Sequence, residues 1–199
     1  MDTKLNILIV GVGGQGVLLA SEIISSVAMA VGLDVKKSEV HGMSQRGGVV
    51  SSHVKIANKV YSPTIQLGRA DIVLSFEKAE ALRGINWLKK DGLVITSTTN
   101  LIPSIVSSSK NLSYPEDAVG EIKKKVEKVI ALDADRIAAE LGNPRLVNTI
   151  LLGVMSNYLP FEKELWLDTL KSKVKAKFVD INLTAFERGR EIKLDTVEA

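Results

Sequence analysis

Cysteine is absent from this chain of 199 residues, and its absence excludes several kinds of chemistry. Without thiols the chain cannot form a disulfide framework, supply a thiolate nucleophile, build a cysteine zinc site or hold a cysteine-ligated iron–sulfur cluster. We therefore assign no metal site to the chain. Any redox metal that takes part in its function is expected to belong to a partner.

Long apolar runs are also missing. The longest ones, Ile7–Val10 and Val27–Val31, are far shorter than the roughly 18 residues that a membrane span requires. The first residues show no basic segment followed by an apolar stretch and a small-residue cleavage site. We therefore expect no membrane association and a cytoplasmic location.

A strong charge of either sign is the third missing feature. The 26 basic and 23 acidic residues give a formal net charge of +3, which is too small to indicate a nucleic-acid partner. Hydrophobic residues make up 45% of the sequence and charged residues 25%, as in ordinary soluble globular proteins. We expect a single domain over residues 1–199, with a core at about 1–142 and a helical extension at about 143–199.

The hydrophobic pattern alternates between short apolar runs and segments of helical spacing. We expect strands at Asn6–Val10, Asp34–Val40, Val49–Ala57, Asp71–Phe76, Gly92–Ser97 and Val126–Leu132. We expect helices at Val17–Val31, Glu77–Lys90, Asp133–Leu141, Arg145–Tyr158, Glu162–Val174 and Asn182–Lys193, and a charged helix opened by Pro115. Residues 49–57 alternate between apolar and polar, so that strand is antiparallel or at an edge. The pattern predicts an α/β fold, Rossmann-like, with a mostly parallel sheet flanked by helices and a helical C-terminal extension.

A glycine-rich loop follows the first expected strand and leads directly into a helix. The GVGGQG sequence places Gly11, Gly13 and Gly16 at the spacing of a dinucleotide-binding fingerprint, with Gly14 and Gln15 between them. Glycines permit the tight turn, a close approach of the backbone to a phosphate, and close packing of the helix. Two interpretations remain open: a phosphate or nucleotide contact, or glycines that only allow the helix to pack.

A second polar loop is expected at the end of the second strand, where open α/β sheets place their ligands. Because both loops follow expected strands, we expect them to be neighbours. An arginine there can grip a phosphate, a carboxylate can contact a ribose, and a histidine can transfer protons or form a local hydrogen bond. Candidate contacts in this loop are Glu39, His41, Ser44, Gln45, Arg46, Gly47 and Gly48. No residue is assigned a catalytic role.

Three further positions have a structural alternative. Ser51, Ser52 and His53 do not amount to a nucleophile site, because a triad also needs a positioned acid and an oxyanion hole. Glu77 either touches a ligand or complements the dipole of the helix that it begins. Asn148 is either a polar anchor in the core or an interface contact.

The sequence resembles the gamma domain of pyruvate and ketoisovalerate ferredoxin oxidoreductases. The resemblance rests on GVGGQG at 11–16, SEVHGMSQRGG at 38–48 and SSHVK at 51–55, and it extends to Asp71–Leu74, Glu77 and Asn148–Gly153. The HGMSQRGG motif at 41–48 and the chain length are most similar to those of the small (beta) subunits of indolepyruvate ferredoxin oxidoreductases.

The resemblance implies a small subunit that is not active alone. It implies a large partner subunit carrying thiamine diphosphate, Mg²⁺ and Fe–S clusters, with ferredoxin as electron acceptor. The complex would convert indolepyruvate or another aryl 2-oxoacid to its acyl-CoA. This chain would hold no cofactor of its own, although CoA is a possible ligand of Gly13, Gly14, Gln15 and Arg46. Two alternatives stay open: a stand-alone NAD(P)-dependent dehydrogenase and a purely structural subunit.

Overall fold

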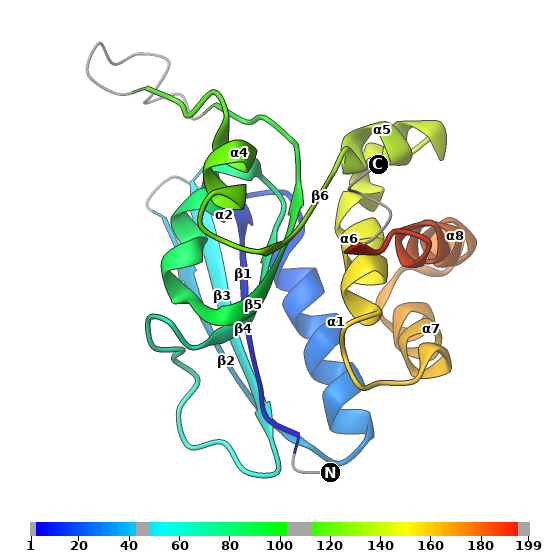
Figure 1. Ribbon diagram of the computed structural model, residues 1–199. Coiled ribbons are helices and arrows are strands. Elements are labelled where there is room, and N and C mark those ends of the chain that lie inside the picture. Colours follow the sequence, from blue (N-terminus) through cyan, green and yellow to red (C-terminus); the bar gives the residue numbers. More distant parts are fainter. Residues whose placement is uncertain (1–2, 43–47, 103–112, 195–199) are drawn as a thin grey trace.

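The protein is built around one six-stranded mixed sheet. The computed structural model describes residues 3–42, 48–102 and 113–194 (Figure 1). The strands are β1 (Leu5–Val12), β2 (Asp34–His41), β3 (Val49–Ala57), β4 (Ala70–Ser75), β5 (Leu88–Ser97) and β6 (Lys128–Leu132). They lie in the order β2-β3-β1-β4-β5-β6.

Strand β3 alone runs against the others. It pairs antiparallel with both β1 and β2, whereas β1, β4, β5 and β6 pair in parallel. The alternation predicts that residues 49–57 form a strand that is either antiparallel or at an edge. The first alternative is confirmed, because β3 is antiparallel and lies inside the sheet, where β2 forms the edge. Strand β2 is consequently separated from β1 by a full strand.

Helices cover both faces of the sheet (Figure 1). Helices α1 and α6 lie on one face and α2 and α4 on the other, while α7 and α8 pack outside α1 and α6. The helices are α1 (Val17–Ala30), α2 (Lys78–Gly84), α4 (Ala118–Lys123), α5 (Ala134–Glu140), α6 (Val147–Ser156), α7 (Lys163–Lys173) and α8 (Val179–Arg190). Short 3₁₀ turns lie at Ile85–Trp87, Pro144–Leu146 and Ala176–Phe178. None of the helices in the described ranges is long and apolar enough to cross a membrane.

The side chains of β1 supply both cores. Ile7 and Ile9 enter the large core that β1 shares with α1, α6, α7 and α8, whereas Leu8 and Val10 enter a smaller core beneath α2 and α4. Each such fully buried side chain contributes on the order of 1.5–3 kcal/mol to stability. Because the helical extension contributes to the large core, its position relative to the sheet is fixed by packing.

Several of the expected elements have different bounds in the structure; the last helix, for example, spans Val179–Arg190 instead of 182–193. The helix expected over 77–90 ends at Gly84, and the chain is already in β5 at Leu88, which lies opposite Ala70 of β4. Pairing with β4 therefore overrides the helical pattern of residues 88–90. The charged helix begins at Ala118 rather than next to Pro115, because Asp117 caps it by accepting a hydrogen bond from the Gly120 amide at 2.9 Å.

Candidate functional site

The glycine loop joins β1 to α1 and is held in place by the side chain of Gln15. The Gln15 Oε1 atom accepts a hydrogen bond from the Val12 amide at 2.7 Å, and its Nε2 donates to the Phe76 carbonyl at 2.9 Å. The amide group thus ties the loop to itself and to the end of β4. In this structure, the side chain of Gln15 positions the loop, and its role as a ligand contact stays a prediction.

The glycines of the loop meet specific steric demands. Gly14 and Gly16 have φ values of +101° and +89°, in the left-handed region that favours glycine. A Cβ atom on Gly16 would lie 2.6 Å from Nδ2 of Asn148 in α6, and one on Gly11 would lie 2.9 Å from Oε1 of Gln15. Because it has no side chain, Gly16 allows α6 to approach the loop, and it is also the N-cap residue of α1.

The expected proximity of the two loops is confirmed. The Gly13 amide donates a hydrogen bond of 2.9 Å to the Gly48 carbonyl, and the Gly42 amide donates one of 2.8 Å to Val49. Four predicted contacts, Ser44, Gln45, Arg46 and Gly47, lie outside the described residues, so their roles stay predictions.

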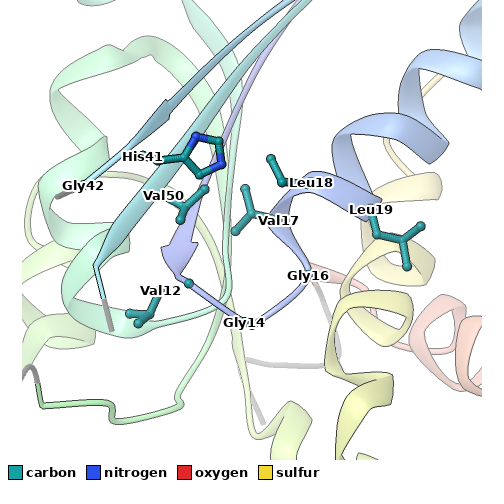
Figure 2. Close-up of a pocket in the computed structure, with 10 residues that line it drawn as sticks. Val12, Gly14, Gly16, Val17, Leu18, Leu19, His41, Gly42 and Val50 are labelled. Carbon is teal, nitrogen blue, oxygen red and sulfur yellow. The ribbon is translucent and has the colours of Figure 1, made fainter. Parts of the chain in front are cut away.

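A cavity of about 760 Å³ opens between the ends of these loops and the start of α1. Figure 2 shows His41 and Val50 on the strand side and Val17 and Leu18 on the helix side. The walls are largely apolar, whereas the backbone of the glycine loop forms its polar part. Helix α1 receives no side-chain cap from the described residues, and the helix dipole favours an anion at its first turn.

A second cavity of about 380 Å³ lies against the same loop, and Gly14, Gly16 and Leu19 line both cavities. Asn148 lines it from the first turn of α6. This residue is only 5% exposed, and its Oδ1 accepts a hydrogen bond from the Thr149 amide at 2.8 Å. Its Nδ2 lies 2.6 Å from the position that a Cβ atom on Gly16 would take, so the side-chain amide of Asn148 lies against the glycine loop.

Other groups around the second cavity set its charge. Arg145 lines it and makes no ion pair with any described residue, whereas Asp135, also in the lining, accepts a hydrogen bond from the Thr99 hydroxyl. Sequence reasoning considered Asn148 only as a core anchor or an interface contact. Nothing in the sequence around Asn148 indicated that it would meet Gly16, because that meeting depends on how α6 packs.

Glu39 lies apart from both cavities. Its carboxylate accepts a hydrogen bond from the Ser21 hydroxyl at 3.3 Å and is 3.4 Å from the Lys37 ammonium. In a sheet where β2 neighbours β1, an acid at this point would lie beside the glycine loop. Here β3 separates the two strands, and the ribose contact of Glu39 stays a prediction.

His53 is a structural residue. Its Nδ1 accepts a hydrogen bond from the Ile65 amide at 3.2 Å, and its ring meets Trp87 edge to face at 6.3 Å. Burial lowers the pKa of His53, so the neutral imidazole is favoured. Ser52 points to the opposite face of the sheet, as alternation along a strand requires, so the two do not form a catalytic pair.

Glu77 lies between the end of β4 and the start of α2. It is 1% exposed, and its carboxylate caps α2 by accepting hydrogen bonds from the Ala79 and Glu80 amides at 2.9 and 3.0 Å. The Tyr114 hydroxyl donates a further hydrogen bond to it. Burial and this carboxylate raise the pKa of Tyr114, so the hydroxyl keeps its proton. Glu77 therefore lies at the start of α2, as the interpretation of a charge that complements the helix dipole required, and it also caps the helix.

Metal binding has no candidate in the described part of the chain, where no group of three or more His, Asp or Glu side chains is arranged to hold an ion. The positive character of the site comes instead from Arg145, from backbone amides and from the Asn148 amide. Such a set suits a phosphate group.

Comparison with known proteins places this arrangement in a family. Residues 6–192 match the family described as pyruvate ferredoxin/flavodoxin oxidoreductase. The indolepyruvate oxidoreductase subunit IorB of Archaeoglobus fulgidus is 41% identical over 190 residues, 94% of each chain. The corresponding subunit of Thermococcus kodakarensis is also 41% identical, over 92% of this chain and 93% of its own.

Solved structures show the same fold. The gamma subunit of a keto/oxoacid ferredoxin oxidoreductase from Geobacter sulfurreducens superposes with a TM-score of 0.73 at 22% identity, over 98% of both chains. A 2-oxoglutarate:ferredoxin oxidoreductase from Magnetococcus marinus also gives 0.73, at 19% identity, over 96% of this chain and 31% of that one. The chain belongs to the pyruvate ferredoxin/flavodoxin oxidoreductase family.

Proposed function

We propose that this chain is the small subunit of a 2-oxoacid:ferredoxin oxidoreductase of the indolepyruvate type. The complex would oxidatively decarboxylate an aryl 2-oxoacid such as indolepyruvate, pass the acyl group to CoA and deliver the electrons to ferredoxin. The observation that carries the proposal is the 41% identity, over nearly the whole length of both chains, with subunits named for indolepyruvate oxidoreductase.

The large subunit would hold thiamine diphosphate, Mg²⁺ and the Fe–S clusters. Two features of this chain support that division: its 199 residues contain no cysteine, and its described part contains no cluster of metal ligands. Oxidative decarboxylation is then the chemistry of the partner's cofactors. This chain contributes binding, orientation and electrostatics.

CoA is the ligand that we assign to the glycine loop. The Magnetococcus enzyme of similar fold was solved with coenzyme A bound, and CoA carries phosphate groups that suit free backbone amides. The amides of Gly14 and of the first turn of α1 would receive a phosphate, and the Nδ2 of Asn148, which lies against the loop, would donate a hydrogen bond to it. Arg46 stays a predicted phosphate contact.

The primary experiment is co-expression of the tagged chain with a large-subunit candidate encoded in the same genome. The purified material is assayed for iron, for thiamine diphosphate, and for dye reduction that depends on both indolepyruvate and CoA. We expect a stoichiometric complex that contains iron and has this activity. If the chain purifies alone and reduces a 2-oxoacid with NADH, the proposal is wrong and the dehydrogenase alternative holds.

The role of the loop in CoA binding is tested with Asn148→Asp in that complex. The aspartate keeps the acceptor for the Thr149 amide but replaces the donor with a negative charge, so we expect the KM for CoA to rise about tenfold or more. The kcat at saturating CoA should change little. The matched control is Asn157→Asp, at the other end of α6, where the amide donates to the Arg190 carbonyl.

The purely structural alternative predicts a different outcome. If the loops only contact the partner, Arg46→Ala and Asn148→Asp will weaken assembly, as measured by co-purification, and leave the KM for CoA of the remaining complex unchanged. Intact assembly with a raised KM for CoA would support the ligand role.

A further inference from the structure

Basic side chains gather at the opposite end of the sheet from the glycine loop. A cavity of about 260 Å³ lies there under the segment that links β3 to β4, and Lys4, Lys55 and Arg69 line it. Strand β1 separates the two places, because it begins at Leu5 and reaches the glycine loop at its other end. This cavity is therefore independent of the site assigned to CoA.

The strand register brings like charges together in this region. Lys55 of β3 lies directly opposite Lys36 of β2 on one side and opposite Asn6 of β1 on the other. Residues directly opposite in antiparallel strands share a face, and like charges placed so destabilise the pair. Lys4 lies two residues before Asn6, and the Arg69 carbonyl accepts a hydrogen bond from the Asn6 side chain at 3.0 Å.

The carboxylates nearby are already engaged with other groups. Asp34 pairs with Lys36 at 2.8 Å and also accepts a hydrogen bond from the Val60 amide. Asp71 pairs with Lys89 and accepts a hydrogen bond from the Asn6 amide at 2.7 Å.

The three lining cations are thus uncompensated. Within the part of the chain that the structure describes, Lys4, Lys55 and Arg69 form no ion pair. Ser62, Thr64 and Gln66 line the same cavity and add side-chain donors.

We propose that this cavity binds an oxyanion of the size of a phosphate group, held by Lys4, Lys55 and Arg69. Ammonium and guanidinium groups form charge-assisted hydrogen bonds with phosphate oxygens, and the hydroxyls of the linking segment complete the set. The bound anion would also compensate the charge of Lys55, since the Asp34 carboxylate is already paired with Lys36. The fold thereby gains an anion site that requires neither the large subunit nor CoA.

The test is a titration of the full chain, labelled with ¹⁵N, with inorganic phosphate at constant ionic strength set by chloride. We expect saturable shifts of the Asn6, Lys55 and Arg69 amides. Lys55→Gln and, separately, Arg69→Gln should weaken this binding by about tenfold. The matched control is Lys125→Gln, an exposed lysine elsewhere that should bind phosphate like the wild type.

The Tm for thermal unfolding, measured in chloride and in phosphate, provides a second readout. Relative to chloride at the same ionic strength, phosphate should raise the Tm of the wild type more than that of Lys55→Gln. Unsaturable shifts, saturable shifts confined to the glycine loop, or equal affinity in wild type and Lys55→Gln would overturn the proposal. The result does not depend on whether the complex uses CoA.

Discussion

The crossing of α6 and α8 is the most sharply defined packing feature of the helical extension. A Cβ atom on Gly153 would lie 2.1 Å from the Phe186 carbonyl oxygen and 3.0 Å from the Gly189 Cα. The obstacle is backbone, so only a separation of the two helices can relieve the clash. Gly153→Ala therefore tests how much the close approach contributes to stability.

The expected magnitude follows from two opposing effects. Alanine favours the helix by about 1 kcal/mol relative to glycine. Forcing the helices apart disturbs the contact between Trp166 and Phe186, whose rings stack at 6.0 Å, and such overpacking costs about 1–3 kcal/mol and occasionally more. Because the clashing atoms cannot move independently, we take the upper end of the packing cost, about 3 kcal/mol. Subtracting the gain of about 1 kcal/mol in helix propensity leaves an expected net loss of about 2 kcal/mol in the free energy of unfolding.

Thermal and urea unfolding of the full chain measure this loss. For a domain of this size, about 2 kcal/mol corresponds to a fall in Tm of about 4–8 °C. The control is Thr184→Ala, at an exposed position of α8 where the hydroxyl bonds back to Asp180, and its effect should stay within about 0.5 kcal/mol. A Tm of Gly153→Ala equal to or above that of the wild type would refute the reasoning.

Three further predictions concern the sheet and its loops. Gln15→Ala removes the hydrogen bonds to Val12 and Phe76 and should lower the free energy of unfolding in urea by about 1–3 kcal/mol. Gln15→Glu keeps only the acceptor for the Val12 amide, so its stability should stay below that of the wild type. Burial holds the pKa of His53 in the folded chain below the value of 6.5 for the free side chain. The unfolded chain therefore binds the extra proton first, and the free energy of unfolding should fall as the pH drops below about 6.5. His53→Gln should remove that part of the pH dependence, and an unchanged dependence of stability on pH would contradict the assignment. Tyr114→Phe leaves the Glu77 carboxylate without one donor and should cost about 1–3 kcal/mol, whereas Tyr61→Phe, at an exposed position, should be neutral.

Local patterns account for the parts of the fold that the sequence predicts correctly. The glycine loop follows an apolar strand and opens a helix with regular apolar spacing, and these neighbours in sequence are also neighbours in the structure. The antiparallel direction of β3 was an open alternative, and its two partners were not predictable. Alternation indicates which face of a strand is buried, but it contains no information on which strands lie beside it.

The roles of individual side chains depend on contacts between distant segments. The side-chain amide of Gln15 hydrogen-bonds to Val12 of its own loop and to Phe76, so this residue of the dinucleotide-binding fingerprint has a structural role. Asn148 lines a cavity beside the glycine loop only because α6 packs against Gly16. Neither contact has a periodic signal in the sequence, because each joins segments that are far apart along the chain.

The helical extension is therefore part of the candidate site. Asn148 stands at the start of α6, and the position of α6 is set further along the same helix, where Gly153 meets the Phe186 carbonyl and Gly189 of α8. A substitution at that crossing should shift the Asn148 amide relative to the glycine loop as well as destabilise the fold. If Asn148 holds a phosphate of CoA, Gly153→Ala should raise the KM for CoA in the assembled complex, although residue 153 lines neither cavity. An unchanged KM in a variant with lowered Tm would instead mean that α6 is positioned by the sheet alone.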